Sequence, residues 1–426
     1  MRTGALLAIL LWAAAAAAHP PVGIAPRTPT TTPKPDAASA PVTSWLDDAR
    51  ARLAADKLDG WLLADWRGEN PVAAEVVKPR GPLHRWFYLV GAAGEPQLLC
   101  HADDAGAFDA KRPLVYRSWR ELEAQLKVLL RGRRRVAMEH APRLPALSRV
   151  DGGTIELVRG TGVQIVSSGD LVTTLRARWS DAQLASHRAA AAALAAVKDD
   201  AFTAIAHGLG RITEYDVRER AQKALADRGL EAAEPPVVAA GVHTADPGFA
   251  PSPERSERIA AGDLVLFSVA ARQKNVRDAV YADLTWVGFV GERVPDEIEH
   301  LFAIARDARA AVVALVEERG KKKLPLRGFE LDDAARAVAA RAGLADRVLR
   351  PTGHSLDTRR FGDGPSFDDA ITHDDRQLLP RTGYVVEPGL YVAGRFGVRV
   401  SVDLFLAADG VQKTPDPPQR VIDLIR

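Results

Sequence analysis

The sequence predicts an α+β protein with two domains, because two kinds of pattern occupy separate parts of its 426 residues. Short strand-like runs alternate with short helical patterns up to about Leu171, which predicts a small α/β domain. From Ser180 onward, long helical patterns occur in pairs with strand-like hairpins between them, which predicts a larger domain of helices and antiparallel strands. The composition, 47% hydrophobic and 26% charged, is ordinary for a globular protein.

The first 41 residues are predicted to lie outside the folded domains. Arg2 precedes an apolar run, Gly4 to Ala18, that ends in small residues, as a secretory signal peptide does. Residues 19–41 are dominated by Pro, Thr and Ala, which predicts an extended linker. We therefore expect residues 1–18 to be a signal peptide and the protein to be exported, periplasmic or secreted, with no transmembrane segment after cleavage. An uncleaved membrane anchor is the alternative.

Residues 42–172 form the predicted N-terminal α/β domain. Its clearest elements are strand-like runs at 86–91, 97–101 and 135–139 and a helical pattern at 119–130. Cys100 is the only cysteine, so the chain forms no internal disulfide, and its apolar strand-like context favours a buried small side chain over a nucleophile.

Residues 180–426 form the predicted C-terminal domain. Its helical patterns are Ala182 to His207, Thr213 to Leu230, Asp296 to Arg319 and Glu330 to Ala345. Strands are predicted at 384–386, 390–392 and 398–406. Two further apolar runs, 264–271 and 280–290, flank a polar turn and predict a β-hairpin. Asp283 lies within the second run, where a carboxylate is costly to bury without a cation or hydrogen-bond donors. Asp283 is therefore a candidate site residue.

The overall charge argues against nucleic acid as a partner. The chain has 57 Lys and Arg residues against 55 Asp and Glu residues, so the two charges nearly balance. It also has no long basic run with interleaved aromatic residues.

A resemblance to a known family rests on short motifs in the C-terminal half. Asp283 precedes a Leu-Thr pair on the predicted hairpin, and then follow Gly353-His354, Glu387-Pro388-Gly389 and Gly397-Val398-Arg399. In this order the motifs resemble those of the Xaa-Pro aminopeptidase, creatinase and methionine aminopeptidase family. The resemblance implies a C-terminal pita-bread domain, an antiparallel sheet covered by helices. It also implies the smaller N-terminal domain of the Xaa-Pro peptidase and creatinase branch.

The resemblance implies a site of two metal ions held by an Asp, a second Asp, a His, a Glu and a second Glu, in chain order. Asp283 matches the second Asp, His354 the His and Glu387 the first Glu. The positions expected for the first Asp and the last Glu hold Ser268 and Ser401 instead. The resemblance therefore predicts that the second metal site is lost.

Two histidines that the resemblance leads us to expect are also replaced. Gly248 stands at one of these positions and Phe361 at the other. Framework residues such as Pro388 and Arg399 remain. The replacements thus affect positions that the family uses for chemistry.

Two states of the remaining site stay open. Asp283, His354 and Glu387 offer one N and two O donors, which suit a single divalent ion such as manganese, cobalt or zinc. The alternative is a polar cluster without metal, in which His354 is protonated between two carboxylates. His354 and His243 are the only candidates for a catalytic base.

These observations predict an exported, catalytically impaired relative of the Xaa-Pro aminopeptidases that binds a small peptide, another small molecule or a partner protein. The alternative is an active hydrolase with one metal or none, acting on X-Pro peptides or, as creatinase does, on creatine. A purely structural module is a third reading. The resemblance also implies a homodimer.

Overall fold

The computed structural model describes residues 45–426, so the predicted signal peptide and linker lie outside the described residues. Within this range no helix has both the length and the apolar character needed to cross a membrane.

The N-terminal domain contains a six-stranded mixed sheet in the order β4-β3-β2-β1-β5-β6. Its strands are β1 (Gly60–Asp65), β2 (Trp86–Gly91), β3 (Gln97–His101), β4 (Leu114–Tyr116), β5 (Arg135–Met138) and β6 (Gln164–Ser167). Its helices are α1 (Trp45–Ala55), α2 (Pro71–Val77), α3 (Trp119–Leu129), α4 (Gly152–Arg159) and α5 (Gly169–Arg176). Residue 172, the predicted end of this domain, lies inside α5.

Both faces of this sheet are covered, because successive side chains of a strand point to opposite sides. Trp61 and Leu63 of β1 belong to a core that includes Leu53 of α1. Leu62, between them, belongs to a second core that includes Leu126 of α3. The fully buried β1 therefore contributes to two hydrophobic layers.

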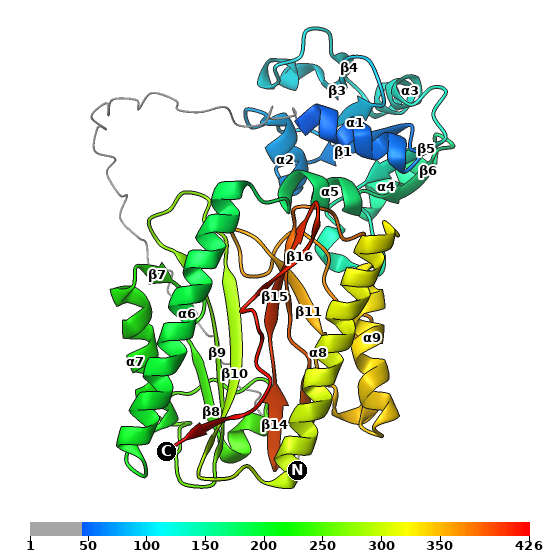
Figure 1. Cartoon of the computed structure of the whole chain (residues 1–426). Helices are drawn as coiled ribbons and strands as arrows, with labels where there is room; N and C mark the ends of the chain where they lie inside the picture. Colours follow the sequence, from blue (N-terminus) through cyan, green and yellow to red (C-terminus); the bar gives the residue numbers. More distant parts are fainter. Residues whose placement is uncertain (1–44) are drawn as a thin grey trace, which may run out of the picture. The chain divides into compact units, whose positions relative to one another are not determined.

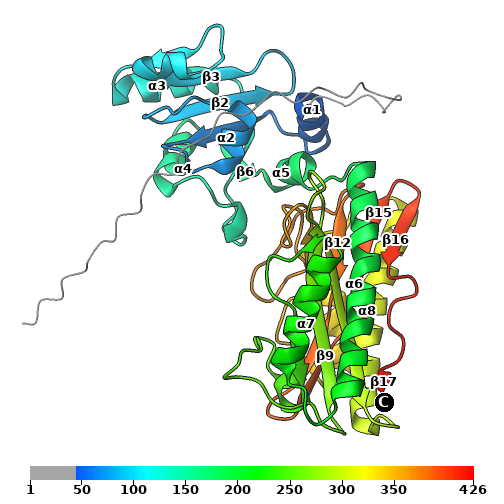
Figure 2. The same cartoon turned by 90° about the vertical axis from the view of Figure 1, so that its left-hand side faces the viewer.

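The C-terminal domain contains four long helices around its strands. They are α6 (Asp181–Gly208), α7 (Glu214–Asp227), α8 (Asp296–Lys322) and α9 (Gly328–Arg341). Ser180 begins α6 with a reciprocal capping box, in which its hydroxyl accepts from Gln183 N and the Gln183 side chain accepts from Ser180 N. Figure 1 shows the α6–α7 pair beside β9 and β10 and the α8–α9 pair beside β15, and Figure 2, turned by 90°, shows α6 and α7 facing the viewer.

The strands of this domain form three sheets. They are β7 (Leu230–Glu231), β8 (Val237–Ala240), β9 (Leu264–Gln273), β10 (Ala282–Val290), β11 (Gly353–Leu356), β12 (Gly383–Val386), β13 (Gly389–Val392), β14 (Phe396–Arg399), β15 (Val402–Ala407), β16 (Gly410–Thr414) and β17 (Asp423–Ile425). The first sheet has the order β17-β10-β9-β7 with β8 also paired to β9, the second has the order β11-β12-β15-β16, and β13 pairs with β14. The observed elements confirm the α+β class.

The predicted hairpin is confirmed, since β9 and β10 pair antiparallel with Thr285 opposite Ser268. One strand prediction needs correction. The apolar run from Val398 to Leu406 is two strands, because β14 pairs with β13 whereas β15 pairs with β12. The chain changes sheets at Val400 and Ser401, and this break places Ser401 against β10.

Candidate functional site

The three side chains predicted to hold a metal come from different strands and are mostly buried. Asp283 lies on β10, His354 on β11 and Glu387 directly after β12, and their side chains are 0%, 9% and 13% exposed. Since β11 and β12 are paired neighbours, His354 lies beside the end of β12. His354 Nε2 is 3.7 Å from Glu387 Oε1.

An arginine is bound to the predicted metal ligand Asp283. Arg360 Nε donates to Asp283 Oδ2 at 3.0 Å, and its Nη1 donates to Glu234 Oε2 at 2.5 Å. The guanidinium also lies over the ring of Phe361, 5.3 Å from the ring centroid. The charge of Asp283 raises the pKa of Arg360 against the opposing effect of burial. A permanent cation therefore already neutralises this carboxylate.

A second arginine reaches the position where the resemblance places the first Asp. Arg399 Nη2 donates to Ser268 Oγ at 2.7 Å, and Arg399 Nε lies 3.7 Å from Glu387 Oε2. Burial acts to lower the pKa of Arg399, but the charge of Glu387 helps to raise it overall. Ser268 Oγ also accepts from Thr285 Oγ1 at 3.0 Å. The small hydroxyl thus leaves room for a guanidinium and bonds to it.

Ser401, at the position of the last Glu, also serves as a structural contact. Its hydroxyl accepts from Thr285 N at 2.7 Å, and its carbonyl accepts from Arg309 Nη1 at 3.2 Å. Arg309 is 3% exposed, and burial lowers its pKa to about 10, so it stays charged at neutral pH. This part of the domain therefore contains a third buried guanidinium.

Asp403 is a further buried carboxyl group near Asp283. Asp403 Oδ2 accepts from Asp283 N at 2.9 Å. Burial, and after it the charge of Asp283, raises the pKa of Asp403 well above its usual range. Asp403 thus favours its neutral form and adds little negative charge to the site.

The arrangement does not fit two divalent ions. At the two positions where the family has a carboxylate, this chain has the hydroxyls of Ser268 and Ser401. Both hydroxyls are already hydrogen-bonded within the protein. Two divalent ions would also bring positive charge into a region where buried arginines are already present.

Asp283, His354 and Glu387 do not converge on a single ion either. Among residues 45–426, only one group of three His, Cys, Asp or Glu side chains has its ligand atoms all within 4.8 Å of one another, and it lies in the N-terminal domain.

Each of the three retained positions nevertheless has a buried polar atom without a hydrogen-bond partner among the described residues. These atoms are Asp283 Oδ1, His354 Nε2 and Glu387 Oε2. Burying an acceptor without a donor costs roughly 1–3 kcal/mol. The site therefore retains the capacity to accept hydrogen bonds from a ligand.

A cavity of about 510 Å³ opens beside these groups. His354, Glu387 and Arg399 supply polar surface, and its apolar lining includes Val237, Phe249, Leu266 and Phe361. The replaced positions Gly248 and Phe361 both line it, and the Phe361 ring lies 4.5 Å from the His354 ring between centroids. Its size suits a small ligand.

His243, the other candidate base, is not among the residues that line this cavity, although its neighbour Thr244 is. His243 Nδ1 lies 2.9 Å from Glu214 Oε2, and its ring stacks on Phe249 at 4.2 Å between centroids. Glu214 is fully buried and also accepts from Ala240 N at 2.6 Å. His243 therefore joins the 3-10 helix Gly241–Ala245 to α7, and His354 is the better candidate for proton transfer.

The order of the motifs, the fold and these positions agree with one family. Residues 185–407, just over half of the chain, match the model of metallopeptidase family M24. This chain belongs to that family. The predicted resemblance and the pita-bread fold are confirmed.

The relatives that it matches are peptidases by name. A probable dipeptidase PepE of Mycobacterium tuberculosis is 25% identical over 268 residues, which cover 63% of this chain and 66% of the relative. An uncharacterized peptidase YqhT of Bacillus subtilis is 27% identical over 188 residues, which cover 44% of this chain and 48% of the relative. The matches thus span just under two thirds or less of the relatives' own length.

Solved structures share the fold over nearly the whole described chain. The dipeptidase PepE from Mycobacterium ulcerans has a TM-score of 0.59 at 21% identity, covering 89% of this chain and 97% of its own. An X-Pro aminopeptidase from Thermotoga maritima has a TM-score of 0.52 at 19% identity, covering 87% and 98%. At these identities the likeness establishes the fold alone.

Sequence reasoning missed the arginine next to the replaced histidine. Arg360 directly precedes Phe361, and its approach to Asp283 closes a loop of 77 residues. A signal was present, because a site that loses cations while keeping Asp283 and Glu387 needs another source of positive charge. Which arginine supplies it depends on the tertiary fold.

Proposed function

We propose that this M24 member has exchanged dimetal hydrolysis for the binding of a small peptide or other small molecule. One observation carries the proposal: guanidinium groups are bonded at two metal-ligand positions, Arg399 to Ser268 and Arg360 to Asp283. A guanidinium is always protonated and only donates hydrogen bonds. It neutralises a carboxylate but cannot bind and activate water as a metal ion does.

The cavity supports a ligand with both polar and apolar parts. His354, Glu387 and Arg399 would bind its polar groups, while Leu266 and Phe249 would contact its apolar part. The unpartnered acceptors on His354 and Glu387 favour a ligand that donates hydrogen bonds, such as an amine or a peptide amide.

Metal content and X-Pro hydrolysis, measured on the same preparation, test the proposal. We expect no metal bound by the pocket and no X-Pro dipeptide cleavage above a protein-free blank. Turnover on the order of 1 s⁻¹ or more, as in a working enzyme, would refute it. The control is Glu387→Ala, which removes a retained polar group and should change neither measurement.

A second candidate function is hydrolysis with one metal or none. The observation that favours it is His354 Nε2, which is unpartnered and lies 3.7 Å from Glu387 Oε1, an arrangement that could hold a proton. Cleavage of creatine or an X-Pro peptide that is abolished by His354→Gln would establish this alternative.

Export and homodimer formation belong to the same proposal. The apolar run Gly4 to Ala18 supports a signal peptide. N-terminal sequencing of the protein from its native cell would identify a cleavage site near Ala18, and light scattering of the purified protein would give its assembly state. An uncleaved Met1 would contradict the signal peptide.

A further inference from the structure

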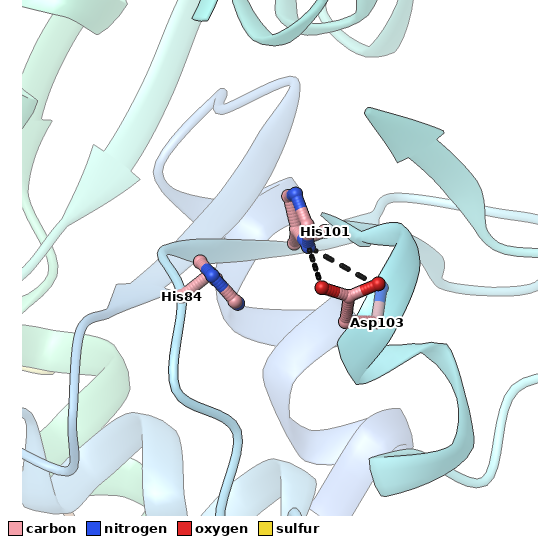
Figure 3. A group of neighbouring side chains, drawn as sticks. All are labelled: His84, His101 and Asp103. Atoms are coloured by element: carbon pink, nitrogen blue, oxygen red, sulfur yellow. Dashed lines mark hydrogen bonds and ion pairs between the residues drawn. The ribbon is translucent and has the colours of Figure 1, made fainter. Parts of the chain in front are cut away.

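The group of closely spaced ligand atoms in the N-terminal domain involves two histidines and an aspartate. His84 lies in the loop before β2, His101 is the last residue of β3, and Asp103 lies in the following 3-10 helix, Ala102–Ala107. Their ligand atoms all lie within 4.8 Å of one another. Figure 3 shows the three side chains gathered at this end of β3.

The buried Asp104 orients the ring of His84. His84 Nδ1 lies 3.0 Å from Asp104 Oδ2, which also accepts from His84 N at 2.8 Å. Asp104 Oδ1 accepts in turn from Leu83 N at 3.2 Å, so both carboxyl oxygens act as acceptors. The His84 ring therefore donates from Nδ1, and its Nε2 carries the lone pair. A carboxylate that holds one ring nitrogen while the other binds metal is a common support for a metal ligand.

His101 and Asp103 are spaced as two ligands of one tetrahedral ion would be. His101 Nδ1 accepts from Asp103 N at 3.3 Å, so Nδ1 carries a lone pair, and it lies 3.5 Å from Asp103 Oδ2. Both interactions are drawn as dashed lines in Figure 3. Two lone pairs facing each other are unfavourable without a cation between them. Zinc bonds of about 2.0 Å to nitrogen and 2.1 Å to oxygen place the two donor atoms roughly 3.4 Å apart.

The two rings hold each other in place while leaving access for an ion. The rings of His84 and His101 stack with centroids 4.0 Å apart, and the edge of Tyr116 packs on His101 at 5.2 Å. The side chain of His84 is 43% exposed and that of Asp103 is 78% exposed. The cluster is therefore open to solvent on the side of His84 and Asp103.

We propose that His84, His101 and Asp103 bind one Zn²⁺ ion, with water as the fourth ligand. Two imidazoles and one carboxylate suit zinc and its first-row neighbours, whereas magnesium and calcium prefer oxygen ligands alone. This site is separate from the family's metal position. A single ion that remains with the purified protein would thus belong to the N-terminal domain.

The test is zinc binding by the full chain, measured by equilibrium dialysis with elemental analysis. We expect one Zn²⁺ per wild-type chain, and a more than tenfold weaker affinity in both His84→Ala and His101→Ala. Asp103→Asn is the variant least able to disturb folding, because Asp103 is exposed and its backbone bond to His101 is kept. It should also weaken binding by several-fold.

Two controls make the result specific. His300→Ala removes an exposed histidine of α8, and Glu387→Ala alters the cavity, so neither should change zinc affinity. Absence of zinc from the wild type would overturn the proposal. So would unchanged affinity in folded His84→Ala and His101→Ala, or loss of the ion in Glu387→Ala. A cobalt-loaded wild type should show the intense visible absorption of a tetrahedral ion, and a weak octahedral spectrum would also contradict the proposed geometry.

Discussion

The cavity of the C-terminal domain and the histidine cluster of the N-terminal domain differ in what neutralises their carboxylates. Next to the cavity, Asp283 is bonded to Arg360, which lines it, so a protein cation already neutralises this carboxylate. At the cluster, Asp103 faces an unprotonated His101 nitrogen. The family motif thus marks the position where the family binds metal, whereas the charges around that position determine whether an ion fits there in this chain.

The two sites also differ in whether their polar groups need a cation when no metal is bound. Buried carboxylates need a cation, and a guanidinium meets that need permanently at a fixed cost in desolvation. Exposed ligands such as His84 and Asp103 are solvated without an ion, so they can take one up or release it. Under our proposals, the family's metal position has become structural and the new site is exchangeable.

The largest expected effect is on catalysis. Ser268→Asp with Ser401→Glu should leave X-Pro cleavage near background, because Arg360 remains on Asp283 and no histidines stand at 248 and 361. Each correctly placed proton-transfer group contributes roughly 10²- to 10⁴-fold in rate. Measurable turnover should therefore require Arg360→Ala, Gly248→His and Phe361→His in addition, assayed with manganese, cobalt or zinc.

Position 248 can accept this change. Gly248 is not among the glycines with positive φ, and an added Cβ would lie 3.3 Å from Asp246 Oδ1, a tight contact with the end of an exposed side chain. High activity in the two-site variant Ser268→Asp/Ser401→Glu alone would show that Arg360 and the missing histidines do not matter.

Breaking the pair between Arg360 and Asp283 should have the next largest effect. Arg360→Ala leaves a fully buried carboxylate without its cation, which should lower the free energy of unfolding by about 3 kcal/mol. Added zinc or manganese should then raise the Tm of this variant but not of a variant with an intact pair, because a ligand that binds only the folded state stabilises it. To keep the N-terminal cluster out of the measurement, both proteins should carry His84→Ala.

The matched control is the neighbouring arginine. Arg359 is 56% exposed and pairs with Asp363, so Arg359→Ala should cost no more than about 1 kcal/mol. Equal losses of unfolding free energy in the two variants would mean that the buried Arg360–Asp283 pair contributes no more to stability than the exposed pair.

The motifs could predict the fold and the retained positions because they are local. The apolar runs of β9 and β10 and the cap at Ser180 are properties of neighbouring residues. Arg360 on Asp283 and His84 beside His101 are contacts between distant segments, and nothing in their local sequence specifies them. The break at Ser401 was missed for the same reason, since only strand pairing separates β14 from β15.

The side chain of His187 is buried, unlike that of His84, and burial disfavours the protonated form of His187. His187 on α6 is 2% exposed, and burial lowers its pKa to about 4, against the effect of its bond to Tyr281 O. The folded state therefore resists protonation of His187, whereas the unfolded state takes up a proton near pH 6.5. Stability should fall as pH decreases from 6.5 to 4, by about 3 kcal/mol from this group.

Urea unfolding at pH 7 and pH 4 measures this term, with His187→Gln as the comparison. The variant should lose about 3 kcal/mol less than the wild type over this range. Asp403→Asn tests the opposite sign. Because the pKa of Asp403 is raised, its contribution is present at low pH and declines as pH rises above the unfolded value of 3.8. An unchanged pH profile in His187→Gln would contradict the assignment of a neutral buried His187.

The smallest expected effect concerns residues 1–41, which the sequence predicts to lie outside the two domains that contain the sites. Met1 to Pro41 has no periodic apolar pattern beyond the export signal, whereas α1 contributes Leu53, which is fully buried in the N-terminal core. A chain that begins at Val42 should therefore keep the Tm and zinc stoichiometry of the longer chain. Leu53→Ala is the contrasting change and should cost about 2–5 kcal/mol, because it opens a cavity in a packed core. A fall of several degrees on truncation would correspond to more than about 1 kcal/mol. That result would mean that residues before Val42 pack on the folded domains, and the linker assignment would be wrong.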